Sequence, residues 1–455
     1  MLPDSDSSRS ISVIVIGAGP VGLAASAHLA ERDVPFLLLE AGSGPAAAVR
    51  AWQHVQLFTP WQYNVDAAAG RLLEASGWVS PEPEAFPTGR DLVHDYLLPL
   101  AHHPRIWPHL LFGRRVTSIT RESISKLEPR TGEHPFTIET IGEDGEVAIY
   151  RAMAVIDASG LWNTPNPAGA DGRPASGERA VRDRISYGVP DIAGAWRSRF
   201  QGQRTLVVGS GHSAFNALSS LVGLAEDDPA TGVLWALRGD PGDASVQGCK
   251  DDELTERTLV RREIGRYLDD GRIHVFAGTR ITGFSNTADG IVTYTGDRQL
   301  PPVDAIVVAT GFRPDHRFAS ELRLDLHPVF ECAYALASLI DPEIAACGTV
   351  SPHGAYHLAH PEPGYWIVGA KSYGRAPTFL LLTGYEQVRS VVAAIAGDEG
   401  AIDVQLELPV TGLCSACTAF LEDREVGQCS CSLDDDECCA EGPEHDAASS
   451  AMVSA

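Results

Sequence analysis

The sequence predicts an α/β fold in which one parallel-sheet unit is inserted into another. Two observations carry this prediction. A short apolar run, a glycine-rich turn and a helix-forming segment follow one another twice, at residues 11–40 and 203–239. Two further apolar runs, at residues 147–160 and 304–314, end in small-residue turns and bracket the second unit. Alternating strands and helices are typical of parallel sheets that carry helices on their faces.

The first unit carries a dinucleotide-binding signature. Gly17, Gly19 and Gly22 form G-x-G-x-x-G between an apolar run and a helix-forming segment. The first glycine of this motif makes a tight turn, the second lets a pyrophosphate approach the backbone, and the third lets helix and strand pack closely. The next apolar run ends in Glu40, where a carboxylate accepts hydrogen bonds from a ribose. The predicted nucleotide contacts are Gly17, Gly19, Pro20, Gly22 and Glu40.

The second unit repeats the signature with a different terminal residue. Gly209 and Gly211 open the turn, and Ala214 takes the place of the third glycine, which is a permitted variant. The following apolar run ends in Arg238. An arginine here pairs bidentately with a 2′-phosphate, so we predict NADPH; the alternative is a solvated arginine at a strand end. The predicted NADPH contacts are Gly209, Gly211, His212, Ser213 and Arg238.

Two further regions are placed to meet a cofactor. Residues 50–64, which follow the first unit, are dense in aromatic and amide side chains and are well placed to line a flavin face. Trp61 is the predicted contact from this segment, with ordinary packing as the alternative. Arg313, after the second bracketing run, either steadies the nicotinamide nucleotide or acts as a structural salt-bridge partner. The two bracketing runs supply the predicted contacts Gly160, Thr310, Gly311 and Arg313.

The two glycine turns, together with Asp157-Ala-Ser-Gly160 and Ala309-Thr-Gly311, resemble those of flavoproteins with two dinucleotide-binding domains. Within that group the chain resembles the flavin-containing monooxygenases. Residues 207–213, 347–354 and 371–378 are similar to stretches of flavoprotein monooxygenases encoded with arsenic-resistance genes. The resemblance implies two Rossmann-like domains, FAD and NADPH as cofactors, O₂ as co-substrate, and oxidation of trivalent arsenicals to pentavalent forms.

The resemblance also assigns a role to Asn64 and meets two departures. Asn64 is the candidate catalytic residue, donating a hydrogen bond to the flavin during its reaction with O₂; a plain turn-forming asparagine is the alternative. The F-x-G-x-x-x-H fingerprint of these monooxygenases is missing between the two turns. A late Gly-Asp that contacts the flavin ribityl chain appears here as Gly369-Ala-Lys371, which puts ribityl contacts there in doubt.

These motifs predict four regions along the chain. Residues 11–197 and 301–400 are expected to form the two parts of an FAD-binding domain, and residues 200–300 the inserted NADPH-binding domain. From about residue 409 the composition becomes polar, acidic and cysteine-rich, which indicates a flexible tail over residues 409–455.

Composition excludes several functional classes. The net charge of −25 argues against binding to nucleic-acid backbones or anionic membranes. The polar first ten residues lack the apolar stretch of a signal peptide, and no run reaches the roughly 20 apolar residues of a membrane span. We therefore expect a cytoplasmic protein.

The cysteines separate the alternative functions. A disulfide or metal-ion reductase needs a redox cysteine pair near the flavin, but no cysteine precedes Cys249. Electron transfer to a quinone, a metal ion or a partner protein stays open, as does a non-enzymatic metalloid-binding flavoprotein. Six of the nine cysteines lie in the tail, where clustered thiolates suit zinc or trivalent arsenic; an inert tail is the alternative. These candidate metalloid-capturing thiols are Cys414, Cys417, Cys429, Cys431, Cys438 and Cys439.

The cofactor preference is testable at Arg238. Replacing Arg238 with Ala should raise the KM for NADPH and leave the KM for NADH nearly unchanged, because only NADPH carries the 2′-phosphate. Loss of such a charge-assisted contact costs on the order of 1.5–3 kcal/mol, or about 10- to 150-fold. Steady-state kinetics with both nucleotides measure the effect, and equal changes for the two would refute this role of Arg238.

Overall fold

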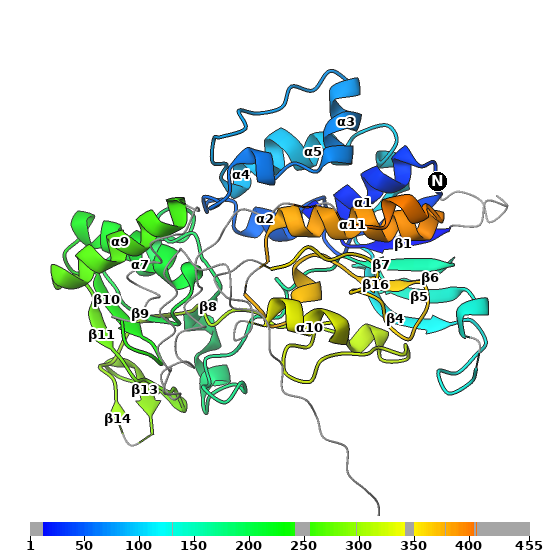
Figure 1. Cartoon of the computed structure of the whole chain (residues 1–455). Coiled ribbons are helices and arrows are strands. Elements are labelled where there is room, and N and C mark those ends of the chain that lie inside the picture. Colours follow the sequence, from blue (N-terminus) through cyan, green and yellow to red (C-terminus); the bar gives the residue numbers. More distant parts are fainter. Residues whose placement is uncertain are drawn as a thin grey trace, which may run out of the picture. The chain divides into compact units, whose positions relative to one another are not determined.

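The computed structural model describes residues 12–129, 131–241, 255–296, 298–341, 350–377, 379–404 and 406. It contains two five-stranded parallel sheets and two three-stranded antiparallel sheets (Figure 1). The predicted α/β fold with two parallel-sheet units is confirmed. The predicted cysteine-rich tail lies outside the described residues.

The first parallel sheet has the strand order β16-β7-β1-β2-β3. Its strands are β1 (Val13–Ile16), β2 (Phe36–Leu39), β3 (Leu110–Leu111), β7 (Ala154–Asp157) and β16 (Tyr365–Ile367). Side chains alternate between the two faces of a strand, so each face of β1 joins a different core. Val13 and Val15 pack with the helices, whereas Ile14 and Ile16 pack toward an antiparallel sheet on the other face.

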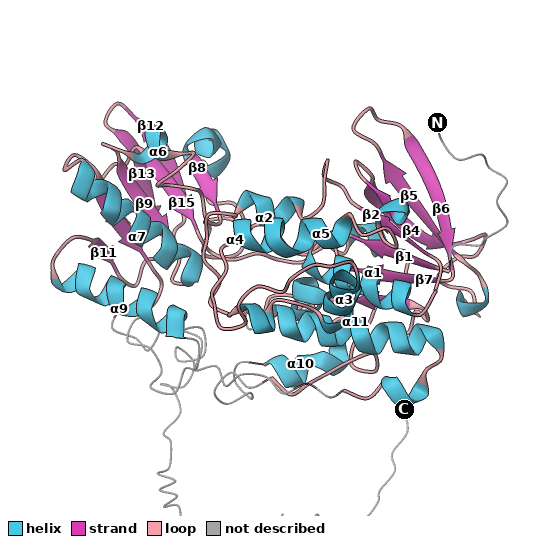
Figure 2. Cartoon of the chain, turned by 90° about the horizontal axis from the view of Figure 1, so that it is seen from above, coloured by secondary structure: helices cyan, strands magenta, loops and turns pink. Residues whose placement is uncertain are grey.

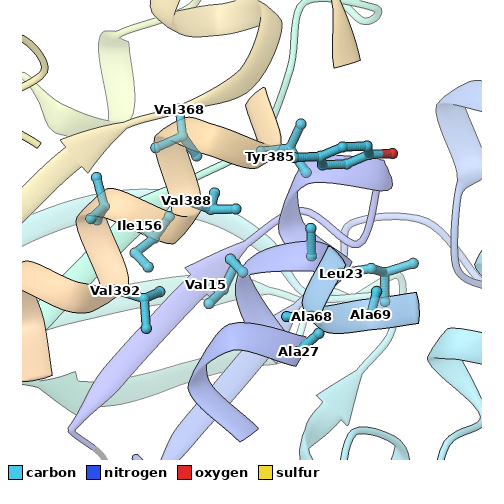
Figure 3. Close-up of a cluster of buried hydrophobic side chains, with 14 of the residues drawn as sticks. Val15, Leu23, Ala27, Ala68, Ala69, Ile156, Val368, Tyr385, Val388 and Val392 are labelled. Carbon is cyan, nitrogen blue, oxygen red and sulfur yellow. The ribbon is translucent and has the colours of Figure 1, made fainter. Parts of the chain in front are cut away.

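Helices α1 (Pro20–Glu31) and α11 (Leu381–Ala396) cover the helical face of the first sheet. They lie side by side in blue and orange in Figure 1, although the two segments are far apart in sequence. Figure 3 shows Val15 of β1 and Ile156 of β7 among side chains from both helices, including Leu23 and Val388. The main core is therefore formed where α1 and α11, two helices far apart in sequence, pack on the adjacent strands β1 and β7.

The opposite face of the first sheet packs on the antiparallel sheet β4-β5-β6. Its strands are β4 (Arg115–Arg121), β5 (Phe136–Ile141) and β6 (Val147–Ala152). Alternate residues Phe136 and Ile138 of β5 are fully buried, while Ile149 on the outer face of β6 is 62% exposed. The sheet is therefore apolar mainly on the face that it turns to the core.

The second parallel sheet has the order β11-β10-β9-β15-β8. Its strands are β8 (Ile185–Tyr187), β9 (Arg204–Val208), β10 (Gly232–Ala236), β11 (His274–Phe276) and β15 (Ala305–Val308). Helices α7 (His212–Asp227) and α9 (Thr255–Asp269) pack on one face, where Val207 and Trp235 point (Figure 2). The other face packs on a small antiparallel sheet of β12 (Gly283–Thr287), β13 (Gly290–Thr295) and β14 (Arg298–Gln299).

All strands of the second sheet lie between β7 and β16 of the first, so this unit is an insertion, as predicted. The sheet nevertheless reaches beyond the range 200–300 expected for it. β8 lies within the range 11–197, and β15 lies within 301–400, yet both pair in the second sheet. The reason is the pairing of the strands. The central strand β9 pairs in parallel with β10 on one side and β15 on the other, and β15 pairs with β8 on its outer side.

The remaining elements are short helical segments. Between β2 and β3 lie α2 (Ala47–Ala51), η1 (Trp61–Tyr63), α3 (Ala67–Ala75), α4 (Gly89–Asp91), η2 (Leu92–Leu97), α5 (Leu98–Ala101) and η3 (Trp107–His109). Elsewhere lie η4 (Thr131–Glu133), η5 (Glu178–Arg184), α6 (Arg197–Phe200), η6 (Arg317–Ala319), α10 (Tyr334–Ile340), η8 (Gly369–Tyr373) and η9 (Glu399–Ala401). Within the described ranges no helix has the length and apolar character needed to cross a bilayer. The cytoplasmic location stays a prediction.

Two buried histidines, His353 beside α11 and His360 beside Asp325, are held neutral. His353 Nδ1 faces the Ser351 carbonyl oxygen at 3.0 Å, and its Nε2 lies 2.9 Å from Gln387 Nε2. A carbonyl only accepts and an amide nitrogen only donates, so this pairing fits the Nδ1-protonated neutral ring. His360 accepts a bond from the Asp325 amide through its Nδ1. Burial lowers the pKa of each of these histidines to about 4.

These two pKa shifts predict acid sensitivity of the fold. The folded pKa of about 4 lies below the ordinary histidine pKa of 6.5, so the unfolded chain binds more protons between these values. Stability is therefore complete above pH 6.5 and falls as the pH drops from 6.5 toward 4, by up to about 1.4 kcal/mol per pH unit for each histidine. Urea denaturation at several pH values measures this slope. His353→Gln should reduce it, the exposed control His94→Gln should not, and equal slopes in both variants would contradict the prediction.

Candidate functional site

The first glycine of each turn is required by the protein itself. Gly17 has φ +97° and Gly209 has φ +123°, both in the region that favours glycine. A Cβ on Gly17 would lie 2.7 Å from the Ala158 carbonyl oxygen, and one on Gly209 would lie 2.3 Å from that of Ala309. In both units, therefore, the segment that follows the neighbouring strand presses on the turn.

The second glycine of each turn faces open space. A Cβ on Gly19 or Gly211 would meet no atom within 4 Å, so the protein's own packing does not require glycine there. Each is an extended N-cap residue with no side-chain cap, which leaves the first amide groups of α1 and α7 available to an anion. Pro20 at the start of α1 removes only an amide that the helix does not use. Both turns thus fit the pyrophosphate of a dinucleotide.

The third position differs between the two units for a steric reason. A Cβ on Gly22 would lie 1.8 Å from the Gly17 carbonyl oxygen. In the second unit Ala214 carries a Cβ and is fully buried. The first turn therefore packs more tightly on its helix than the second.

Glu40 ties the end of β2 to the first turn. Its Oε2 accepts from the Ala18 amide and its Oε1 from the Gly42 amide, both at 2.7 Å. Each carboxylate oxygen has capacity for a further bond. The predicted ribose contact is compatible with this geometry and stays a prediction.

These turns lie within a matched family region. Residues 14–331 match the pyridine nucleotide-disulphide oxidoreductase family. The chain belongs to this family. The predicted oxidoreductase class is confirmed, and FAD and NADPH are the cofactors of this flavoprotein; the residues assigned to each remain predictions.

Several relatives of this pyridine nucleotide-disulphide oxidoreductase differ in the reactions that they perform. A ferredoxin–NADP reductase from Salinispora tropica is 26% identical over 346 residues, which cover 75% of this chain and 87% of the relative. Bacillithiol disulfide reductase Bdr from Bacillus cereus has a similar fold, with TM-score 0.65, 16% identity, and 86% and 100% of the two chains covered. The cadaverine monooxygenase DfoA from Erwinia amylovora has TM-score 0.59, 13% identity, and 88% and 97% covered.

The chain segments that follow β7 and β15 connect the two units, and we call them the crossovers. Hydrogen bonds join one crossover to the other. Asn166 Nδ2 donates to the Thr310 carbonyl at 3.0 Å, and Thr310 Oγ1 donates back to the Asn166 carbonyl at 3.1 Å. Arg313 donates through Nε to Asn166 Oδ1 at 2.8 Å and through a terminal nitrogen to the Gly172 carbonyl. These bonds place Arg313 in a structural link, and no acidic side chain among the described residues forms an ion pair with it. Its contact with the nicotinamide nucleotide stays a prediction. Gly160 and Gly311, both at positive φ, complete the two turns.

The aromatic segment 50–64 reaches the second glycine turn. The Phe58 ring lies 4.9 Å from the ring of His212, the first residue of α7. Trp61 is 5% exposed and belongs to the main core, so its burial fits the packing alternative. Arg238 is exposed at the end of the β10 segment, and Ser213 is half-buried beside His212. The structure therefore brings His212 next to the segment expected at the flavin.

Asn64 is buried in a hydrogen-bonded turn. Its Oδ1 accepts from Thr59 Oγ1 at 2.9 Å, and its Nδ2 donates to the carbonyls of Thr59 and Pro60 at 2.7 and 2.9 Å. Both donor hydrogens of the amide have partners inside the turn. This arrangement favours the turn-forming alternative over a bond to the flavin, and the catalytic role stays a prediction.

The sequence analysis missed a buried charge pair beside the first turn. Lys371 Nζ donates to Asp157 Oδ2 at 2.7 Å, and the two side chains are 1% and 0% exposed. Burial would raise the pKa of Asp157, but Lys371 and two bonds from Ser159 outweigh it, so the pKa of Asp157 is lowered. The available signal was a charged residue at or near the end of each of two apolar strand segments: Asp157 directly follows 154–156, and Lys371 comes three residues after 365–368.

Two adjoining hollows lined by arginines lie away from the glycine turns. One, of about 430 Å³, is lined by Arg179, Arg182 and Arg313, and the other, of about 910 Å³, by Arg173, Arg179 and Arg280. Glu178 at the floor is 2% exposed, and its carboxylate accepts from two backbone amides and from a tyrosine hydroxyl. Arg173 is ion-paired with Asp171, which also lines the larger hollow. Five arginines against Asp171 and Glu178 leave the lining of the two hollows with a net positive charge.

The described cysteine and acidic side chains offer no redox or metal centre. Cys332 is 1% exposed, and burial raises the pKa of its thiol to about 11. Among the residues that the structure covers, no group of three His, Cys, Asp or Glu side chains is arranged to hold a metal ion. The six tail cysteines proposed to capture metalloid lie outside the described residues.

The open space at Gly19 gives a sharp test of the FAD site. Gly19→Val should fold, because Gly19 has an extended backbone and its Cβ would meet no protein atom, but the purified variant should contain no FAD. The matched change Gly211→Val should keep FAD and raise the KM for NADPH. Flavin absorbance and circular dichroism measure both, and a folded Gly19→Val protein with normal flavin content would refute the assignment.

Proposed function

We propose that this flavoprotein is an NADPH-dependent monooxygenase that oxidises a soft nucleophile, with trivalent arsenicals as the favoured substrates. The main support is that the part of the chain described by the structure shows no thiol pair for disulfide reduction, the alternative chemistry of its family; Cys332 is the one cysteine within it. No cysteine precedes Cys249, and Cys332 is buried with a raised thiol pKa. Reduction of a disulfide proceeds through an accessible thiolate, so these residues supply no such route.

The choice of substrate rests on sequence resemblance and on the tail. Three stretches of the chain resemble flavoprotein monooxygenases encoded with arsenic-resistance genes. The tail cysteines carry soft thiolate ligands, which suit trivalent arsenic. We propose that these thiols capture the arsenical and raise its concentration near the flavin. Acidic neighbours raise the pKa values of the tail thiols, and so oppose capture of the arsenical by thiolates. The role of the tail is therefore tested separately from the oxidation reaction.

The chain's own residues bind and orient the reactants. The open turns at Gly19 and Gly211 are suited to hold the two pyrophosphates, and the buried strands β1 and β9 fix these turns in rigid sheets. When bound, FAD accepts hydride from NADPH and activates O₂. The overall reaction consumes NADPH, a proton, O₂ and the arsenical; one oxygen atom goes to arsenic, which loses two electrons, and the other leaves as water.

Product stoichiometry tests the proposal. The full-length enzyme is supplied with NADPH, O₂ and methylarsonous acid in the presence of catalase, which removes any peroxide that would oxidise the arsenical without the enzyme. One pentavalent arsenical should form for each NADPH consumed, as measured by chromatography with arsenic detection. NADPH oxidation without pentavalent product under catalase would overturn the monooxygenase proposal for this substrate.

The same assay decides the role of the tail. A chain truncated after residue 412 is compared with the full-length enzyme at low arsenical concentration. A raised KM with unchanged flavin reduction supports capture by the thiols. Equal kcat/KM values would remove the thiols from catalysis and leave the monooxygenase proposal standing.

Electron transfer to an acidic carrier protein is the second candidate function. It is favoured by the 26% identity to a ferredoxin–NADP reductase and by the arginine-lined hollows. Reduction of a ferredoxin by the NADPH-reduced enzyme should then slow with ionic strength and with Arg179→Glu and Arg182→Glu, because the encounter is electrostatic. The exposed control Arg90→Glu should leave the rate unchanged. A rate insensitive to salt and to these changes would remove this candidate.

A further inference from the structure

The buried pair of Lys371 and Asp157 joins two distant segments of the FAD-binding unit. Asp157 is the last residue of β7, and Lys371 lies in η8, which follows β16. The Nζ to Oδ2 distance is 2.7 Å, and both side chains are at most 1% exposed. Figure 3 labels their neighbours Ile156 and Val368 in the main core. A charge pair this deep needs further bonds to offset the loss of water.

Those further bonds converge on the Asp157 carboxylate. Tyr365 donates to Oδ2 at 2.9 Å, and Ser159 donates to Oδ1 through its hydroxyl at 2.6 Å and its amide at 3.1 Å. Lys371 Nζ also reaches Ser159 Oγ at 3.2 Å and lies 4.2 Å from the centre of the Phe318 ring. The ammonium group thus holds both Asp157 and Ser159 of the crossover.

The crossover held in this way touches the first glycine turn. A Cβ on Gly17 would lie 2.7 Å from the Ala158 carbonyl oxygen and 3.0 Å from Ser159 Cα. On the Lys371 side, a Cβ on Gly369 would lie 3.2 Å from Val21, in the first turn of α1. The crossover that contains Asp157 and the segment that contains Lys371 therefore both contact the Gly17 turn and the start of α1, which together form the cradle for the FAD pyrophosphate.

We propose that Lys371 is a positioning residue for FAD: it neutralises Asp157 and so fixes the crossover 157–160 against the Gly17 turn. Without Lys371, the buried Asp157 carboxylate is left without its cation. The carboxylate then moves toward water, taking the crossover with it, or takes up a proton and stays.

In a variant that lacks Lys371, movement of the Asp157 carboxylate toward water competes with its protonation. The rate of FAD release should therefore depend on pH. The other titratable groups that face the pair are Tyr365, Asp315, His316 and His360. The pKa values of Asp315 and Tyr365 lie far outside pH 6.5–8.5, and burial lowers the pKa values of both histidines, which favours their neutral form across that range. Asp157 is then the group that titrates in Lys371→Met, because burial raises its pKa once the cation is gone.

The experiment follows release of FAD from the full-length holoenzyme by the rise in free-flavin fluorescence on dilution. Lys371→Met should release FAD on the order of 10- to 100-fold faster than wild type at pH 8.5, and the difference should shrink toward pH 6.5. The double variant Asp157→Asn/Lys371→Met has no buried charge, so it should retain FAD nearly as wild type does, independently of pH. This double variant also carries the test if the single variant does not fold.

A second buried pair provides the matched control. Arg121 and Glu362, 3% and 0% exposed, are bonded at 2.7 Å on the antiparallel-sheet side of the same unit. Arg121→Met should lower the melting temperature without a pH-dependent change in FAD release. Three results would overturn the proposal: wild-type release in Lys371→Met, no rescue in the double variant, or the same pH-dependent release in Arg121→Met. The inference depends on the FAD site alone, so failure of the arsenical assay does not affect it.

Discussion

The close approach of a crossover to a glycine turn is the constraint on which the rest of the structure depends. It occurs twice, where the carbonyl of Ala158 meets Gly17 and the carbonyl of Ala309 meets Gly209. Any side chain at these two glycines would overlap the backbone of the neighbouring strand's end. The approach exists because β1 and β9 each pair in parallel with the strand that leads into the crossover. In the first sheet β1 and β7 therefore end at the same edge, and in the second sheet β9 and β15 do so. The glycine turns, each of which fits a pyrophosphate, lie at these edges.

Several buried charged and polar groups lie beside the first of these glycine turns. Asp157 and Lys371 are paired in the core, and Gln387 of α11 bonds the Gly369 amide at 2.8 Å from within the same region. Such groups cost stability if they lose a partner, which makes the local geometry all-or-none. These bonds hold the segments around the first glycine turn through the protein's own side chains, and a site organised before binding loses less entropy when its cofactor binds.

The family alone does not choose the electron acceptor. The proteins similar to this chain include a disulfide reductase and a monooxygenase, whose folds resemble its own, and a ferredoxin–NADP reductase, which is similar in sequence. The features of this chain that bear on the electron acceptor are a buried Cys332, the lack of a cysteine before Cys249, and arginines around the hollows near Tyr187. Function therefore has to be argued from these residues and not from the fold.

The sequence by itself determined the features that depend on local patterns. These features are the glycine turns, the apolar strands before them, and the terminal residues Glu40 and Arg238. They could be predicted because all the parts of each signature lie within one strand–turn–helix unit of about forty residues. The tertiary structure alone decided the Lys371–Asp157 pair, which spans 214 residues, and the Arg313–Asn166 link, which spans 147. It also placed β8 and β15 in the second sheet and turned the Asn64 amide into its own turn. Such contacts arise only when separate units pack, and local periodicity carries no information on which distant segments will meet.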